Sequence, residues 1–106
     1  MNNLLTFDKI YQAREVLKDI IRVTPINDTS RLVDDFELYV KMESLQKTGS
    51  FKIRGAYFKI FNLTKEEKEC GIIAASAGNH AQGVAYTAKK LGINATIVMP
   101  KDAPLQ

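Results

Sequence analysis

Hydrophobic residues near the start of the chain recur at the spacing of an α-helix. The pattern begins at Thr6, most charged side chains fall off it, and its apolar positions share one face: Ile10, Ala13, Leu17, Ile20 and Ile21. We expect Thr24-Pro25 to end this helix, because the residue before a proline disfavours the helical conformation. The next segment, 27–36, is polar and rich in turn-forming residues.

The middle of the chain predicts a strand followed by two helices. Residues 37–43 alternate between apolar and polar side chains, which is the pattern of a strand. After a loop at 46–49, Ser50 is a good N-cap for a helix that runs to about residue 63. This helix is apolar nearly all round, so we expect it to be buried between layers. Residues 64–67 carry the capping-box signature of a further short helix.

The last third predicts a βαβ unit. It consists of a strand at 72–75, a helix at 79–91 that Gly92 ends, and a second buried strand at 95–99 that Pro100 stops. A unit of this kind has parallel strands joined by a right-handed crossover. The predicted fold class is therefore α/β.

Composition limits the partners of this chain. Its 106 residues allow one domain at most. Fifteen Lys and Arg against twelve Asp and Glu give a net charge of +3. The basic residues are spread along the chain, whereas nucleic-acid-binding domains gather them into a patch, so we expect no nucleic-acid partner. No apolar stretch approaches the ~20 residues needed to span a bilayer, and no secretory signal is visible. We expect a cytoplasmic protein with no membrane partner.

Cysteine usage and the chain end add two expectations. Cys70 is the only cysteine, so neither an intrachain disulfide nor a multi-cysteine zinc site is possible, and we expect no metal. The final residues, 100–106, resemble the opening of a new element in which Asp102 caps a helix. We therefore expect residues 1–106 to form a single partial domain of a longer protein.

The loop after the strand at 72–75 is a candidate anion site. In open α/β sheets, ligands bind beyond the carboxyl ends of strands, often at a helix N-terminus. There the first amides lack intrahelical partners and the helix dipole favours negative charge. Gly78 lets the backbone approach a ligand without a Cβ in the way. The residues fit a plain strand-to-helix turn capped by Ser76 or Asn79 at least as well.

Lys52 is a candidate nucleophile. In the first turn of a buried helix, an amine is desolvated and lies near the positive end of the dipole, and both effects favour its neutral form. The neutral amine is the form that makes a Schiff base. The alternative is that Lys52 and Lys59 form the wet edge of the helix. Arg54 suits a bond to a carboxylate or carbonyl between elements, and His80 suits either acid–base chemistry or a structural position.

Two long segments, 40–56 and 76–85, carry a resemblance to a known family. The first contains Ser50-Phe51-Lys52-Ile53-Arg54-Gly55-Ala56 and the second Ser76-Ala77-Gly78-Asn79-His80-Ala81-Gln82-Gly83. Together they resemble the N-terminal third of threonine dehydratase (threonine ammonia-lyase). That family uses pyridoxal 5'-phosphate on the tryptophan-synthase-β-like fold (fold type II). The resemblance extends over nearly all of the chain.

The resemblance implies a role for each matching residue. Lys52 would form the internal aldimine with the cofactor and, once freed, would remove the Cα proton of the substrate. Phe51 would pack against the pyridoxal ring, and Asn79 would hydrogen-bond the phenolic oxygen of the cofactor. The substrate carboxylate would be held by the loop residues Ser76, Ala77, Gly78, Asn79 and His80.

The reaction implied is the dehydration and deamination of L-threonine to 2-oxobutanoate and ammonia, a step towards isoleucine or in threonine catabolism. Serine racemases of this family carry a second serine where this chain has Ala77, which favours elimination over racemisation. A serine dehydratase or racemase-like enzyme, or an inactive truncated remnant, stays as an alternative. The family's phosphate-binding glycine-rich loop lies downstream and is absent, so we expect the isolated chain to be inactive or very weak. The full-length parent is expected to be a homo-oligomer.

Overall fold

A computed structural model describes residues 4–104 of the chain. Its elements follow the α/β class expected from the sequence. In chain order they are α1 (Phe7–Leu17), β1 (Ile26–Asp28), η1 (Ser30–Leu32), β2 (Tyr39–Lys41), η2 (Glu43–Leu45), η3 (Lys47–Gly49), α2 (Lys52–Phe61), α3 (Lys65–Cys70), β3 (Ile72–Ala75), α4 (Asn79–Leu91) and β4 (Ala95–Val98), where η marks a 3₁₀ turn. Within residues 4–104, no helix is long and apolar enough to cross a lipid bilayer.

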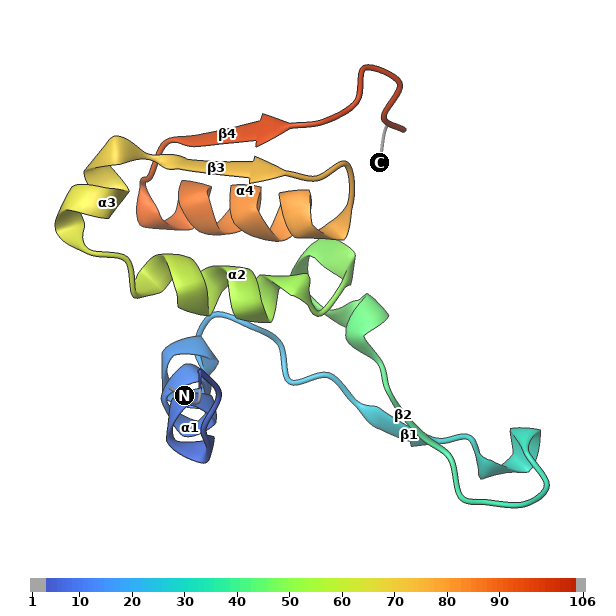
Figure 1. Ribbon diagram of the computed structural model, residues 1–106. Helices are drawn as coiled ribbons and strands as arrows, with labels where there is room; N and C mark the ends of the chain where they lie inside the picture. Colours follow the sequence, from blue (N-terminus) through green and yellow to red (C-terminus); the bar gives the residue numbers. More distant parts are fainter. Residues whose placement is uncertain (1–3, 105–106) are drawn as a thin grey trace.

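The βαβ unit is confirmed, but its second strand, β4, was expected to be buried and exposes three of its four residues. Strands β3 and β4 pair in parallel, from Ile72 opposite Ala95 to Ala75 opposite Val98. Helices α2 and α4 lie side by side on the same side of this pair (Figure 1). Gly92 ends α4 in the left-handed conformation, with φ of 68°, as the sequence predicted. The core between these elements consists of buried and half-buried residues from both helices and both strands: Ala56, Ile60, Leu63, Ile72, Ala74, Val84, Leu91, Ile93 and Ile97.

The β1–β2 hairpin extends away from the α2–α4 body (Figure 1). Its strands are antiparallel, and Ile26 lies opposite Lys41. The expected strand at 37–43 is therefore present but shorter. Strand β1 was not predicted, and most of it falls in the segment 27–36, which the sequence showed only to be polar and rich in turn-forming residues. Its hydrogen bonds come from pairing with β2, a contact that local sequence does not reveal.

Helix α1 is shorter than predicted. It begins after Thr6, whose Oγ1 accepts the Lys9 amide at 3.3 Å, but it ends at Leu17 and not near Thr24. The amides of Ile20 and Ile21 both bond to the Leu17 carbonyl and close the helix. Beyond that point the backbone of Arg22 is hydrogen-bonded by the side chain of Gln46.

Gln46 fixes the backbone at Arg22 and prevents it from continuing the helix. Its Oε1 accepts the Arg22 amide and its Nε2 donates to the Arg22 carbonyl, both at 2.8 Å. The Gln46 side chain is buried, at 3% relative exposure, so this pair of bonds is sheltered from water. A bond across 24 positions leaves no local signal in the sequence.

Helix α2 differs from expectation at its start and in its burial. It begins at Lys52 with Phe51 at the cap position, although the Ser50 Oγ still accepts the Lys52 amide at 3.4 Å. Only one face is buried, whereas Phe51 and Phe61 are 58% and 43% exposed. The prediction of burial all round is therefore wrong for the described residues, because α4 and α1 cover only part of α2 and the rest is exposed to solvent.

The capping box of α3 is confirmed. The Thr64 amide donates to Oε2 of Glu67 at 2.8 Å, and the Glu67 amide donates to Oγ1 of Thr64 at 3.2 Å. This reciprocal pair starts α3 within a few residues of the end of α2. The turn that follows leads directly into β3.

Candidate active site

The predicted site residues lie at one edge of the βαβ unit. Strand β3 ends at Ala75, the loop 76–78 follows, and α4 begins at Asn79. The N-terminal ends of α2 and α4 both point toward the carboxyl ends of β3 and β4 (Figure 1). Lys52, the first residue of α2, is therefore at the same edge as the loop. This is the edge at which open α/β sheets bind ligands.

Ser76 organises the loop. Its Oγ accepts the amide of Gly78 at 3.3 Å and the amide of Ala81 at 3.2 Å. Since a hydroxyl has one proton to donate and two lone pairs to accept, both lone pairs are used and the proton stays available. Ser76 therefore caps the turn, as the structural alternative predicted, and can still donate to an anion.

The first turn of α4 offers further donors. Among the described residues, the amides of Asn79 and His80 have no hydrogen-bond partner, whereas the Gln82 amide bonds to the Gly78 carbonyl at 3.2 Å. Together with the Ser76 hydroxyl, these amides form a small group of donors at the positive end of a 13-residue helix. Such a group suits a carboxylate or phosphate oxygen.

Gly78 has open space beside it. Its φ of −141° and ψ of −137° lie outside both the helical and the extended regions. A Cβ built there would meet no atom of the chain within 4 Å. The absence of a side chain therefore leaves room for a ligand to approach the backbone, as the sequence predicted.

Lys52 is exposed, which corrects the expectation that it is desolvated. Its Nζ lies 5.5 Å from the centroid of the Phe51 ring, and the ring itself is largely exposed. The expected burial fails because Lys52 lies on a part of α2 that the neighbouring helices α4 and α1 leave exposed. The predicted position at the N-terminus of α2 is confirmed.

Arg54 binds Glu43, as expected for a residue that joins two elements. Its Nη2 lies 2.7 Å from Oε1 of Glu43, and its Nε donates to Oε2 at 2.9 Å. Oε1 also accepts the hydroxyl of Thr24 at 2.6 Å. The Arg54 guanidinium, together with the Thr24 hydroxyl, lowers the pKa of Glu43 to about 2, against the opposing effect of desolvation. These bonds connect the start of α2 to the N-terminal segment.

Sequence reasoning missed the geometry immediately before Ser50. Thr48 and Gly49 both have left-handed φ angles, 65° and 73°. A β-branched residue in this region is strained by about 1–3 kcal/mol. The Thr48 Oγ1 is buried and has no hydrogen-bond partner among the described residues. The only available signal was the Thr-Gly pair, which we interpreted as an ordinary loop.

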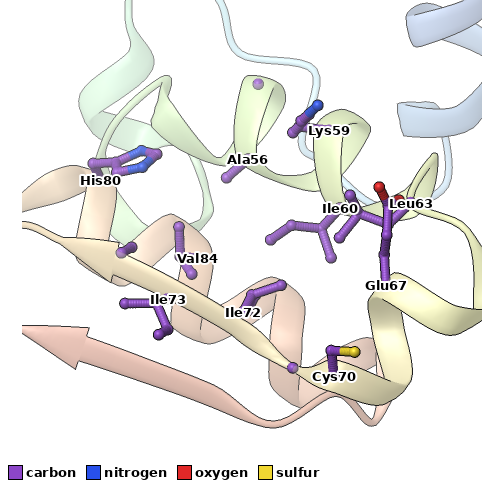
Figure 2. A pocket seen from close by; sticks show the side chains of 13 residues that line it. Ala56, Lys59, Ile60, Leu63, Glu67, Cys70, Ile72, Ile73, His80 and Val84 are labelled. Atoms are coloured by element: carbon purple, nitrogen blue, oxygen red, sulfur yellow. The ribbon is translucent and has the colours of Figure 1, made fainter.

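A separate apolar cavity of about 500 Å³ lies between α2, α3, α4 and β3. His80 stands at one end of it, beside α2, and Cys70 lies at the other end, near Glu67 (Figure 2). Of the predicted site residues, His80 alone lines this cavity. The cavity is therefore distinct from the edge that carries Lys52 and the 76–78 loop, and His80 lies between the two.

The donors and the amine match part of what the expected cofactor requires. A primary amine is present at a helix start, and an anion-binding group of amides lies at the same edge. Among the described residues no cluster of His, Cys, Asp and Glu could hold a metal ion. The chain therefore fits two parts of a pyridoxal phosphate site, the amine that holds the cofactor and the donors for the substrate carboxylate.

Comparison with known proteins gives consistent matches. The family model described as "Pyridoxal-phosphate dependent enzyme" matches residues 17–106. The chain is 55% identical to the L-threonine ammonia-lyase of Thermotoga maritima over 104 residues, which are 96% of this chain and 26% of that protein. The chain thus spans about a quarter of that relative.

Solved structures agree with the fold. The processed form of threonine deaminase isoform 2 from Solanum lycopersicum is 38% identical, with a TM-score of 0.76 over 94% of this chain and 30% of that one. The serine racemase of maize is 40% identical, with a TM-score of 0.84 over 92% of this chain and 30% of that one. The α/β arrangement described above is therefore that of fold type II pyridoxal phosphate enzymes.

Proposed function

Since the chain belongs to the family of pyridoxal-phosphate dependent enzymes, we propose that it carries part of the active site of an enzyme that deaminates L-threonine to 2-oxobutanoate and ammonia. One observation carries the proposal. The amine of Lys52 and the donors of the 76–80 loop come from two adjacent helices whose N-termini face the same edge. A reaction at the α-carbon of an amino acid needs both an amine and a carboxylate site there.

Pyridoxal phosphate, when bound, supplies an aldehyde that amines attack and a ring that stabilises negative charge at the α-carbon. The residues of this chain hold and orient the reactants around it. Lys52 would hold the cofactor through Nζ and would carry the Cα proton. Phe51 would pack against the ring, and the Asn79 side chain would donate to the phenolic oxygen.

The loop binds the substrate carboxylate. The Ser76 hydroxyl has a free proton, and the amides of Asn79 and His80 are unpaired among the described residues. Ala77 and Gly78 complete the turn without side chains that would fill the space. Fixing the carboxylate places the α-carbon beside the amine, and well-oriented groups react at effective molarities of about 10⁵ M or more.

A serine racemase-like function is the second candidate, because the maize serine racemase shares the fold at a TM-score of 0.84. Racemisation needs a proton carrier on each face of the substrate. The methyl side chain of Ala77 carries no exchangeable proton, so elimination is favoured at this position. L-serine is expected as a secondary substrate. We also propose a cytoplasmic homo-oligomer as the complete enzyme.

A chimera tests the proposal, because the chain spans about a quarter of its relative. Residues 1–106 would replace the matching segment of the Thermotoga maritima enzyme. Formation of 2-oxobutanoate from L-threonine, of pyruvate from L-serine and of L-serine from D-serine would be followed. We expect the first activity to be the fastest and racemisation to be absent. Faster racemisation than elimination would favour the second candidate.

The role of Lys52 is tested in the same chimera. Borohydride reduction with pyridoxal phosphate, followed by peptide mapping, should place the label on Lys52. Lys52→Arg should abolish both label and activity. Lys59→Arg, a change of the same type seven residues along α2, should retain both. A label on another lysine in the unsubstituted chimera would reject the assignment.

A further inference from the structure

Helices α2 and α4 come into direct backbone contact at Gly83. A Cβ built on Gly83 would lie 3.2 Å from the amide nitrogen of Ile53 and 3.3 Å from both the carbonyl carbon and oxygen of Lys52. These atoms belong to the backbone of α2, so they cannot rotate away as the end of a side chain can. Any side chain at position 83 would have to push the two helices apart.

The surroundings of this contact leave little room for adjustment. Ile53 and Thr87 are both 0% exposed, and Val84 is 5% exposed. The Thr87 Oγ1 donates to the Gly83 carbonyl at 2.8 Å, which ties the contact point to the next turn of α4. Closely packed interiors transmit such a displacement and do not absorb it.

The contact lies between the two parts of the candidate site. Gly83 is about one helical turn beyond Asn79, the first residue of α4. Its contact on α2 is the backbone of Lys52 itself. The separation between the lysine backbone and the donor amides therefore depends on how closely α2 and α4 approach at Gly83, within the wider packing of the two helices.

We propose that Gly83 is a positioning residue, which sets the distance between Lys52 and the loop 76–80. This inference rests on the function proposed above and adds a residue on which the rate of the proposed reaction depends. Gly83 contacts neither substrate nor cofactor in this role; it acts through the backbone of Lys52. A methyl group at position 83 shifts the amine relative to the carboxylate site while both sets of groups stay present.

The test compares two glycine-to-alanine changes in the chimera. Gly83→Ala adds a methyl group at the contact, whereas Gly55→Ala adds one on α2 where no atom lies within 4 Å. We expect Gly83→Ala to lower kcat about 3- to 10-fold, since contacts of 3.2–3.3 Å require a shift smaller than the ~1 Å displacement that can cost 100-fold. KM should change less than kcat. Gly55→Ala should keep both constants within about twofold.

A second readout does not depend on turnover. The rate at which borohydride traps pyridoxal phosphate on Lys52, relative to Lys59, should fall in Gly83→Ala and stay unchanged in Gly55→Ala. The absorbance band of the bound cofactor should shift in the first variant only. A Gly83→Ala chimera with unchanged kcat, trapping rate and spectrum would overturn the proposal.

Thr87→Val covers the case in which Gly83→Ala does not fold. This change keeps the shape of the side chain and removes only the bond to the Gly83 carbonyl. We expect it to fold and to lower kcat about two- to fivefold with KM unchanged, because helix misplacement by a fraction of an ångström is enough to do so. An unaltered kcat in a folded Thr87→Val chimera would then reject the inference.

The outcomes also separate this inference from the proposed function. If every variant lacks activity on threonine while trapping on Lys52 still depends on position 83, the substrate is wrong and the positioning role stands. If Lys52 is not labelled in the unsubstituted chimera, both proposals fail. If threonine is deaminated equally well with glycine or alanine at position 83, only the positioning role fails.

Discussion

The two halves of this chain are held together by different forces. The α2–α4–β3–β4 body has an apolar core to which both helices and both strands contribute. The N-terminal segment and the β1–β2 hairpin expose most of their apolar side chains, including Ile26 at 64% and Leu32 at 73%. That half is fixed by polar bonds from Gln46 and Glu43. Lys52 lies at the junction, so both kinds of force position it.

The first turn of α2 belongs to both halves. Apolar packing fixes it against α4, where Ile53 is fully buried beside Gly83. Polar bonds fix the same turn to the preceding segment through Arg54 and Glu43. Since the two sets of contacts meet at neighbouring residues of α2, each can be removed separately and its effect measured.

The largest expected effect is on the apolar half. Ile53→Ala leaves a cavity at a fully buried position and should lower the free energy of unfolding by about 3 kcal/mol. The matched control is Ile73→Ala, because Ile73 is 78% exposed and the same deletion should cost about 0.5 kcal/mol or less. Denaturant unfolding followed by circular dichroism measures both. Equal losses would contradict the core described here.

The next effect is on the polar half. Glu43→Gln removes the charge that pairs with Arg54 and should destabilise the chain by about 2 kcal/mol at neutral pH, after allowance for the solvent that reaches Arg54. The control is Glu15→Gln, which breaks the exposed pair with Lys18 and should leave unfolding unchanged. A Glu43→Gln variant as stable as the original would show that Thr24 and Gln46 suffice to hold this half.

The same carboxylate predicts a pH dependence. The pKa of Glu43 is about 2 in the folded chain against an ordinary value of 4.5. Well above pH 4.5 both folded and unfolded states are ionised, and the contribution is complete. As the pH falls from 4.5 to about 2, the unfolded chain takes up a proton first, so stability declines. Unfolding midpoints measured from neutral pH down to this range should fall less steeply for Glu43→Gln, and parallel profiles would contradict the low pKa.

The two halves also differ in how far the sequence predicted them. The βαβ unit was recognised with its parallel strands, because its periodicity and the glycine after α4 are local signals. The capping box of α3 was recognised for the same reason. The end of α1 was predicted wrongly and β1 was not predicted, since the first depends on Gln46 and the second on pairing with β2. Contacts between residues far apart in the sequence leave no periodic trace.

The candidate site shows the same division. The 76–80 loop was predicted from its place between a strand and a helix, and the structure places its donors there. The burial of Lys52 was predicted wrongly, because the apolar composition of a helix does not say which side its neighbours cover. The contact at Gly83 was not predicted at all, since a glycine inside a helix can equally well have open space beside it, as Gly55 does.

The smallest expected effect on the free energy of unfolding comes from replacing Gly55 or Gly92 with alanine. Gly55 lies inside α2 with open space beside it, so Gly55→Ala should stabilise the chain by about 0.5–1 kcal/mol through reduced backbone entropy in the unfolded state. Gly92 ends α4 at a φ of 68°, where an alanine is strained, so Gly92→Ala should destabilise it by about 1 kcal/mol. Both variants change one glycine to alanine, and neither touches an atom within 4 Å. Their opposite signs in denaturant unfolding therefore isolate backbone conformation from packing, and equal signs would show that the end of α4 is not left-handed in solution.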